Sequence, residues 1–140
     1  MTLTLIEKTF LLKKCDLFSE LDLDLVLAIA DKAVLRELEN KEMIFSEGQE
    51  AAAFYVIIQG SVVIDEEVTL LPFTYFGDEA LFSQTNRKYS AEASGKTKCL
   101  TLSRQHLGEI ILECPQVALQ LLRAYAAITP YRKPANQDAV

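Results

Sequence analysis

The sequence predicts a mainly β fold with α-helices, a double-stranded β-helix (jelly-roll-like) barrel flanked by N- and C-terminal helices. Two observations support this fold class. Apolar residues recur at helical spacing near both ends of the chain, within residues 3–34 and 103–128. Between them, short β-branched and aromatic runs are separated by polar turns at close intervals, which is typical of antiparallel strands. We therefore expect one β domain between two helical segments.

Two helices are expected before the first strand. Residues 3–14 carry apolar side chains every three or four positions, with lysines on the other faces. Ser19 precedes Asp22 by three residues, a loose form of the capping box that predicts the start of a second helix of about a dozen residues. The apolar stripe of this second helix consists of Leu23, Val26, Leu27, Ala30, Ala33 and Val34.

The strands are expected between residues 34 and 102. The dense run 54–58 ends at Gly60, where we expect a turn or bulge before the next apolar run, 62–64. The acidic residues 65–67 then form a tight connection to a strand at 68–71. After the segment 76–90, strands are expected at 91–93 and 98–102, with residues 94–96 as the turn between them.

Helical spacing returns at Ser103 and is interrupted at Cys114-Pro115. Pro115 suits the first turn of a last helix that ends at Ile128, because a first-turn residue needs no amide proton. The apolar face of this helix is expected to be Val117, Leu121, Leu122 and Tyr125. The chain thus divides into an N-terminal helix at 1–14, one domain at 15–128 and a tail at 129–140 that we expect to be disordered.

Composition excludes several classes of protein. A net charge of −6 and a pI near 4.8 argue against nucleic acid as a partner. No apolar run reaches the roughly 18 residues of a membrane span, and no signal-peptide cleavage site follows the apolar N-terminus. We expect a soluble, cytoplasmic protein without membrane insertion. The cysteines Cys15, Cys99 and Cys114 are odd in number and widely spaced, which is typical of free thiols in a reducing compartment.

Catalytic chemistry is poorly supported by the sequence. His106 is the only histidine, whereas a metal enzyme built on a barrel needs several inward ligands. Cys114 lies eight residues from His106, a spacing that does not place the two on one helix face, so we expect an exposed helical histidine. The acidic residues 65–67 are expected to be solvated at a hairpin tip. The sequence therefore predicts no enzyme, no metal site and no cofactor.

The segment Phe76-Gly77-Asp78-Glu79-Ala80-Leu81, followed by Arg87, has the parts of a small nucleotide pocket. Gly77 permits close approach of a ligand to the backbone, because glycine lacks a Cβ. A short helix starting after Gly77 would present free amides to a phosphate. An acidic side chain can accept ribose hydroxyls, and Arg87 can pair with a phosphate or, alternatively, with Asp78 or Glu79.

Both these residues and the order of elements resemble the cyclic nucleotide-binding domain, the regulatory module of cAMP-dependent kinase regulatory subunits, cyclic-nucleotide-gated channels and catabolite-activator-type regulators. The resemblance covers roughly residues 15–128. Glu47-Gly48 with the run 54–60 resembles the first half of the family's barrel, and the segment 76–87 resembles its phosphate-binding cassette. Residues 100–104, Leu107 and the last helix resemble the barrel exit and the C-terminal helices.

The resemblance implies a set of ligand contacts. In the family, the cassette glycine and the amides after it line the ribose-phosphate, an acidic residue takes the ribose 2′-hydroxyl, and an arginine neutralises the cyclic phosphate. Carried over by position, the ligand-binding residues are Gly77, Asp78, Arg87 and the amides of Glu79 and Ala80, with Ser90 at a position that faces the ligand. Tyr89 either stacks on the base or plugs the base site, because it and Lys88 stand where the family prefers small residues.

Two functions follow from the resemblance. The first is a non-enzymatic regulatory or sensor domain that binds cAMP or cGMP and signals by movement of its C-terminal helices. The alternative is a degenerate copy of the fold that binds no nucleotide and serves as a protein-interaction or tethering module. A helix-turn-helix regulator does not fit into the residues after Ile128, so signalling is expected to need a protein partner or an output domain outside this chain.

Overall fold

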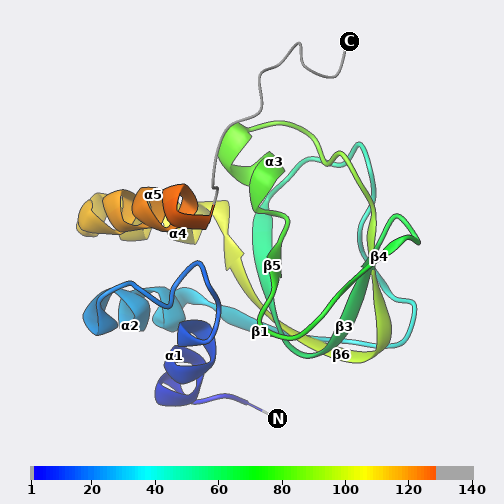
Figure 1. Cartoon of the computed structure of the whole chain (residues 1–140), viewed down its shortest axis with the longest axis horizontal. Coiled ribbons are helices and arrows are strands. Elements are labelled where there is room, and N and C mark those ends of the chain that lie inside the picture. The colour runs from blue at the N-terminus through cyan, green and yellow to red at the C-terminus, as the bar shows by residue number, and fades with distance from the viewer. Residues whose placement is uncertain (1, 129–140) are drawn as a thin grey trace.

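The computed structural model describes residues 2–128, in which a curved antiparallel β-roll lies beside a group of four helices (Figure 1). In chain order the elements are α1 (Leu5–Lys13), α2 (Leu23–Lys32), β1 (Val34–Leu38), β2 (Met43–Phe45), β3 (Ala53–Ile64), β4 (Val68–Leu70), β5 (Tyr75–Phe76), α3 (Asp78–Ser83), β6 (Ala91–Ser103), α4 (Arg104–Glu113) and α5 (Gln116–Ile128). The mainly β fold class with flanking helices is confirmed. The expected tail, 129–140, lies outside the described residues.

The two long strands β3 and β6 form the centre of the sheet. They pair in antiparallel fashion from Ala53 opposite Ser103 to Ile64 opposite Ala91. β1 and β2 both pair with β6, whereas β4 and β5 both pair with β3, so every described pairing is antiparallel. The chain enters α3 directly from β5, which places the short helix at the edge of the roll (Figure 1).

The expected turn at residues 94–96 is wrong, because β6 continues through it along the same partner strand. The pairing shifts from Lys98 opposite Gln59 to Ser94 opposite Ser61, which is a bulge. The Thr97 hydroxyl stabilises this bulge by donating to the Ser61 carbonyl at 3.0 Å. Gly60 lies at the same bulge with φ of +85°, so the bulge expected there is confirmed, within a single strand.

The capping box expected at Ser19 and Asp22 is also wrong. Asp22 is the N-cap of α2 but its side chain bonds no helix amide; its Oδ2 instead accepts from Gln120 of α5 at 3.1 Å. The reciprocal capping box occurs at α1, where Thr4 Oγ1 accepts from the Glu7 amide and Glu7 Oε1 accepts from the Thr4 amide. Asp22 therefore holds α2 against α5 through a contact 98 residues apart in sequence.

The apolar core has two parts. One is the interior of the roll, formed by Leu38, Ile44, Phe45, Ala53, Tyr55, Ile57, Val62, Phe76, Ala91, Ala93 and Cys99. The other lies between the helices and the outer face of the sheet, where α5 contributes Val117, Leu121 and Ala124. Leu122 was expected on the buried face of α5 but is 66% exposed. The helix packs through Val117, Leu121 and Ala124, which follow one another at helical spacing, and Leu122 lies outside this stripe.

The remaining sequence expectations concern thiols and histidine. All three cysteines are free, and burial raises the pKa of Cys15 to about 11 and that of Cys99 to about 12. His106 is half-buried rather than exposed, since it lies at the start of α4 beside β1. Within residues 2–128 there is no cluster of three metal-ligating side chains, and no helix is long and apolar enough to cross a membrane.

Candidate functional site

The candidate site is the segment 76–90, which contains the cassette at 76–87 and begins at the end of β5, just before α3. Gly77 caps α3 with φ of +81°, in the left-handed region that favours glycine. A Cβ at this position would lie 2.9 Å from Nη1 of Arg87 and 3.3 Å from the Tyr55 ring. The helix expected after Gly77 is confirmed, and only glycine fits both its dihedral angle and its crowded surroundings.

Arg87 is brought against Gly77 and is only 4% exposed. Its Nη1 donates to the Gly77 carbonyl at 2.6 Å and its Nη2 donates to the Ala53 carbonyl at 2.5 Å. The guanidinium carbon lies 4.0 Å from the centre of the Phe45 ring, a cation–π contact. Nε is buried without a hydrogen-bond partner, and no described carboxylate forms an ion pair with this guanidinium. The side chain is thus a buried cation balanced by carbonyl dipoles and an aromatic face.

Tyr89 lies over the start of α3. Its hydroxyl accepts a hydrogen bond from the Gly77 amide at 3.0 Å and donates one to Glu79 Oε1 at 3.1 Å. Its ring packs on Phe45, with the two ring centres 5.4 Å apart. Burial, followed by the hydrogen bond to Glu79, raises the pKa of Tyr89, so the hydroxyl stays protonated and able to donate.

Asp78 faces the C-terminal helix. The residue is 7% exposed, and its Oδ2 accepts from the Tyr125 hydroxyl of α5 at 2.7 Å. The pKa of Asp78 is raised to about 6, chiefly by burial and then by hydrogen bonding with Glu79, whereas the bond from Tyr125 acts to lower it. Tyr125 therefore connects the cassette to α5 at a position where the sequence predicted only an apolar helix face.

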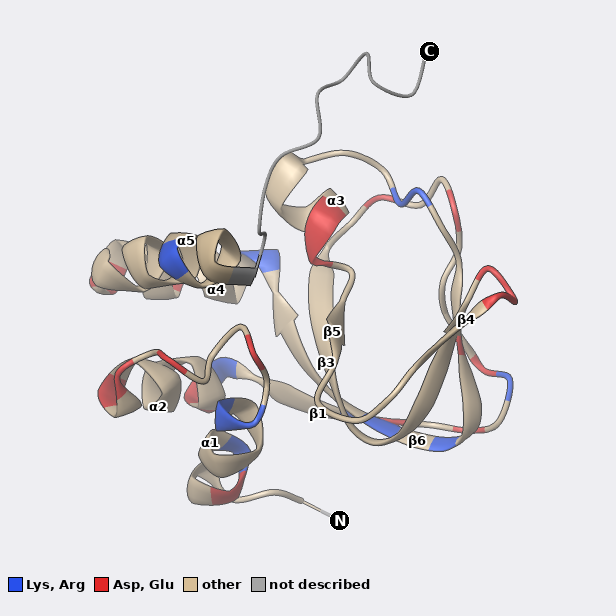
Figure 2. Cartoon of the chain, in the orientation of Figure 1, with Lys and Arg blue, Asp and Glu red and all other residues tan. Residues whose placement is uncertain are grey.

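Glu79 completes the acidic side of the cassette. Burial alone would raise the pKa of its carboxyl, but hydrogen bonds from Asp78, its own amide and Tyr89, together with the charge of Arg87, lower it. Figure 2 shows this arrangement of charge: the start of α3 is acidic, and the segment that returns from α3 toward β6 is basic. Glu79 and Arg87 therefore lie close together, but no ion pair joins them.

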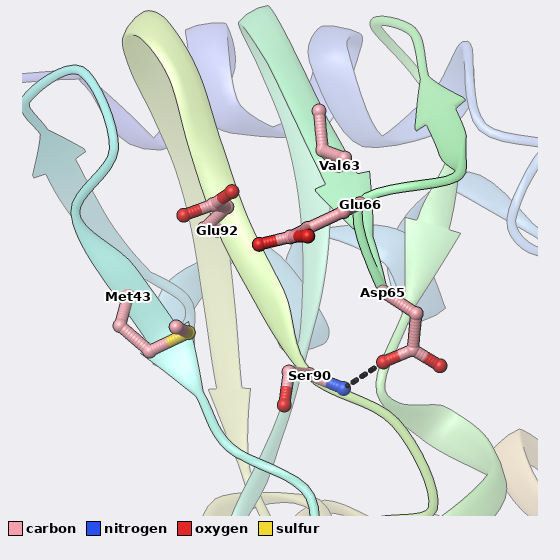
Figure 3. Close-up of a pocket in the computed structure, with 6 residues that line it drawn as sticks. All are labelled: Met43, Val63, Asp65, Glu66, Ser90 and Glu92. Atoms are coloured by element: carbon pink, nitrogen blue, oxygen red, sulfur yellow. Dashed lines mark hydrogen bonds between the residues drawn. The ribbon is translucent and has the colours of Figure 1, made fainter.

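Ser90 lies differently from the expected ligand contacts. Ser90 Oγ accepts from the Glu47 amide at 2.9 Å, and its own amide donates to Asp65 Oδ1 at 2.8 Å. Ser90 lies beside Asp65 (Figure 3) and lines a separate cavity of about 320 Å³, which Gly77 does not line. Ala80 is buried in α3 and lines a cavity of about 360 Å³ together with Glu79, Arg87 and Tyr89. The structure therefore brings together Gly77, Asp78, Glu79, Ala80, Arg87 and Tyr89, but not Ser90.

Besides the cavities lined by Ser90 and by Ala80, two open spaces adjoin the cassette. A cavity of about 490 Å³ lies between β4, β5 and the start of α3, and its polar groups include Asp78, Glu79 and Tyr89. This volume is within the range of small-molecule sites, roughly 300–1,000 Å³. A second, mostly apolar groove of about 640 Å³ lies between α3 and the C-terminal helices, where Phe82 and Leu122 are exposed. Tyr125 lines this groove, so the groove and the cassette share the contact with α5.

Two residues of the site were not identified from the sequence. Phe45, which supports both Arg87 and Tyr89, stands in a short apolar run that indicated only a strand. Tyr125 was placed on an apolar helix face, although a tyrosine there carries a hydroxyl that needs a partner when it is buried. That hydroxyl was the one signal in the sequence that could have pointed to a polar contact with α5.

The fold and this site define a β-roll domain with a polar site at the start of a short helix, and comparison with known proteins identifies its family. The family model for the cyclic nucleotide-binding domain matches residues 35–114, more than half of the chain. The chain belongs to the cyclic nucleotide-binding domain family.

Individual relatives agree with this assignment. The chain is 26% identical over 132 residues to a cAMP-dependent protein kinase regulatory subunit of Dictyostelium discoideum, covering 86% of this chain and 38% of that protein. It is 27% identical over 112 residues to a protein of Rhodopseudomonas palustris provisionally named as a potassium channel protein, covering 75% and 27% of the two chains. The chain thus spans less than two fifths of the length of either curated relative.

Solved structures show the same fold. The N-terminal domain of a transcriptional regulator from Streptomyces coelicolor A3(2) superposes with a TM-score of 0.75 at 25% sequence identity. That match covers 84% of this chain and 88% of the other.

Proposed function

We propose that this chain is a non-enzymatic regulatory domain that binds a cyclic nucleotide, cAMP or cGMP, at the cassette. The observation that carries the proposal is Arg87, a guanidinium that is 4% exposed, has an unpartnered Nε and forms no ion pair with a described carboxylate. A buried cation that forms no direct ion pair is unfavourable, and a cyclic phosphate anion can supply that pairing with a geometry that suits the guanidinium. Membership of the family gives the ligand class.

Signalling through the C-terminal helices is the second part of the proposal. Asp78 lies at the position that takes the ribose hydroxyl by resemblance, and its carboxylate now accepts from Tyr125 of α5 at 2.7 Å. A ribose hydroxyl that bonds Asp78 would compete with Tyr125 and so loosen α5 from the cassette. The ligand can shift the equilibrium between the docked and the loosened α5 only by as much as its affinities for these two arrangements differ.

A nucleotide-free interaction module is the second candidate, and a specific observation favours it. The Gly77 amide, the Asp78 carboxylate and the Glu79 carboxylate all have partners within the chain. In that case the phenols of Tyr89 and Tyr125 replace the ligand permanently, and the domain serves to hold a protein partner.

Calorimetric titration with cAMP, cGMP and a cyclic dinucleotide separates the two candidates. We expect saturable binding of a cyclic mononucleotide by the native chain and a loss on the order of 30-fold or more in Arg87→Ala, because a charged hydrogen-bonded contact is removed. Arg87→Lys keeps the charge without the planar fork and should bind with intermediate affinity. Arg104→Ala, which removes an exposed arginine outside the cassette, serves as the matched control. The absence of heat and of any Tm shift at millimolar nucleotide in the folded native chain would refute the sensor.

A further inference from the structure

We propose that Tyr89 is a built-in competitor for the nucleotide: its hydroxyl occupies hydrogen-bonding groups of the cassette, and the side chain must swing away before a ligand can bind. This inference rests on the proposed function, since it concerns how access to the same cassette is regulated. It assigns to Tyr89 a closing role in place of stacking on the base.

The first argument is the geometry of the hydroxyl. One oxygen bonds both the Gly77 amide, at 3.0 Å, and Glu79 Oε1, at 3.1 Å. The Gly77 amide is the first amide of α3 that has no partner within the helix, and a phosphate oxygen there would have to take the place of the phenol oxygen. The phenol oxygen and a phosphate oxygen cannot both take the acceptor position at the Gly77 amide, so the phenol and the phosphate exclude each other.

The second argument is charge. By donating to Glu79, Tyr89 holds a carboxylate beside the Gly77 amide and helps to keep the pKa of that carboxyl low. An anionic phosphate that approaches this position meets a like charge, which is unfavourable at short range. Release of Tyr89 therefore removes both an occupant and the hydrogen bond that holds Glu79 in place.

The third argument is that the ring can move. Tyr89 is half-buried, and its ring lies on Phe45 at the edge of the roll rather than within the fully buried core. It borders two open spaces, the cavity of about 490 Å³ beside β4 and another of about 360 Å³ beside Arg87. An outward rotation therefore meets open space rather than packed side chains.

Tyr89→Phe tests the inference, because it keeps the ring on Phe45 and removes only the hydroxyl. We expect cAMP or cGMP to bind the variant on the order of tenfold more tightly than the native chain, since two hydrogen bonds no longer have to be broken. Tyr89→Ala, which also removes the ring, should bind at least as tightly as Tyr89→Phe if the variant is folded by circular dichroism.

A second measurement needs no nucleotide. Amide hydrogen exchange of Gly77, followed by NMR on ¹⁵N-labelled protein, should become faster by on the order of fivefold in Tyr89→Phe, because the amide loses its acceptor. Tyr75→Phe is the matched control, since its hydroxyl bonds neither Gly77 nor Glu79. Unchanged Gly77 exchange in Tyr89→Phe would overturn the geometry on which the inference depends.

The outcomes of the titration distinguish this inference from the proposed function. Binding by the native chain that is unchanged or weakened in both Tyr89 variants supports the sensor and overturns the competitor. If the two Tyr89 variants bind nucleotide and the native chain does not, Tyr89 is supported as a competitor, and the proposal that the native chain senses free nucleotide is overturned. No binding by any of the three proteins overturns both, because an opened cassette that stays empty has nothing for Tyr89 to exclude.

Discussion

Asp78→Asn should make the protein more stable at neutral pH, although it alters a residue at the centre of the cassette. Burial raises the pKa of Asp78 from its ordinary 3.8 to about 6 in the folded chain. Between pH 3.8 and about pH 6, Asp78 is protonated in the folded state and ionised in the unfolded state. The contribution of this carboxyl is therefore fully favourable below about pH 4 and is lost as the pH rises through about 6.

The magnitude follows from the shift. A rise of the pKa from 3.8 to about 6 corresponds to roughly 3 kcal/mol of unfolding free energy lost between acid and neutral pH. Asparagine has no charge to desolvate, its carbonyl oxygen can accept from Tyr125, and its amide can donate to Glu79. We expect the variant to match the native chain near pH 4 and to exceed its stability by about 2–3 kcal/mol at pH 7.5.

Urea unfolding followed by far-ultraviolet circular dichroism, repeated from pH 4 to pH 8, measures the effect; the chain has no tryptophan for fluorescence. At each pH, the difference in unfolding free energy between Asp78→Asn and the native chain isolates the contribution of Asp78 from that of the other carboxyls. Tyr125→Phe is the complementary variant, because it removes a hydrogen bond that lowers the pKa of Asp78. It should lose about 1.5–3 kcal/mol at pH 7.5 and less at pH 4.

Two results would refute this reasoning. A difference between Asp78→Asn and the native chain that is independent of pH would show that Asp78 ionises normally in the folded state. A loss of stability in Asp78→Asn at pH 7.5 would show that the carboxylate, despite its burial, is stabilised by more than the contact with Tyr125.

Three further predictions test other parts of the fold. Gly60→Ala should lose about 2–4 kcal/mol in urea unfolding, because a Cβ there would lie 2.5 Å from a backbone carbonyl oxygen. Gly95→Ala, with φ of +74° but open space around it, should lose only about 1 kcal/mol, and equal losses in the two variants would contradict the steric argument. Thr4→Ala should reduce stability by about 1 kcal/mol by removing the capping box of α1; an unchanged urea midpoint would exclude a stabilising role for that box. A thiol reagent at pH 8 should modify Cys114 first and the two buried cysteines, whose pKa values are raised, only in denaturant; rapid reaction of all three thiols in the native chain would contradict their burial.

Local patterns were sufficient for most of the fold. Helical spacing located the four flanking helices, and dense apolar runs located the central strands, because burial of one face imposes a period on the sequence. The pattern failed at residues 94–96, where Ser-Gly-Lys is typical of a turn but forms a bulge. A bulge and a turn need the same backbone freedom, and only the partner strand decides between them.

The position of the cassette was also predictable, but its contacts were not. Gly77, Asp78 and Arg87 carry their types and spacing in the sequence, and the resemblance to the family followed from them. The partner of Asp78 is 47 residues away on α5, and Arg87 contacts the Ala53 carbonyl 34 residues earlier. No local period relates residues at such separations, so neither contact could be deduced from spacing.

The sequence by itself determined that this chain forms a β-roll with flanking helices and that its cassette follows β5. The tertiary structure decided how that cassette is held: Arg87 is buried against Phe45, Tyr89 bonds the Gly77 amide, and Asp78 bonds Tyr125. The physical reason is that secondary structure follows from the periodic burial of apolar groups along the chain. The partners of a polar side chain depend instead on which distant backbones the sheet register and the helix packing bring within hydrogen-bond distance.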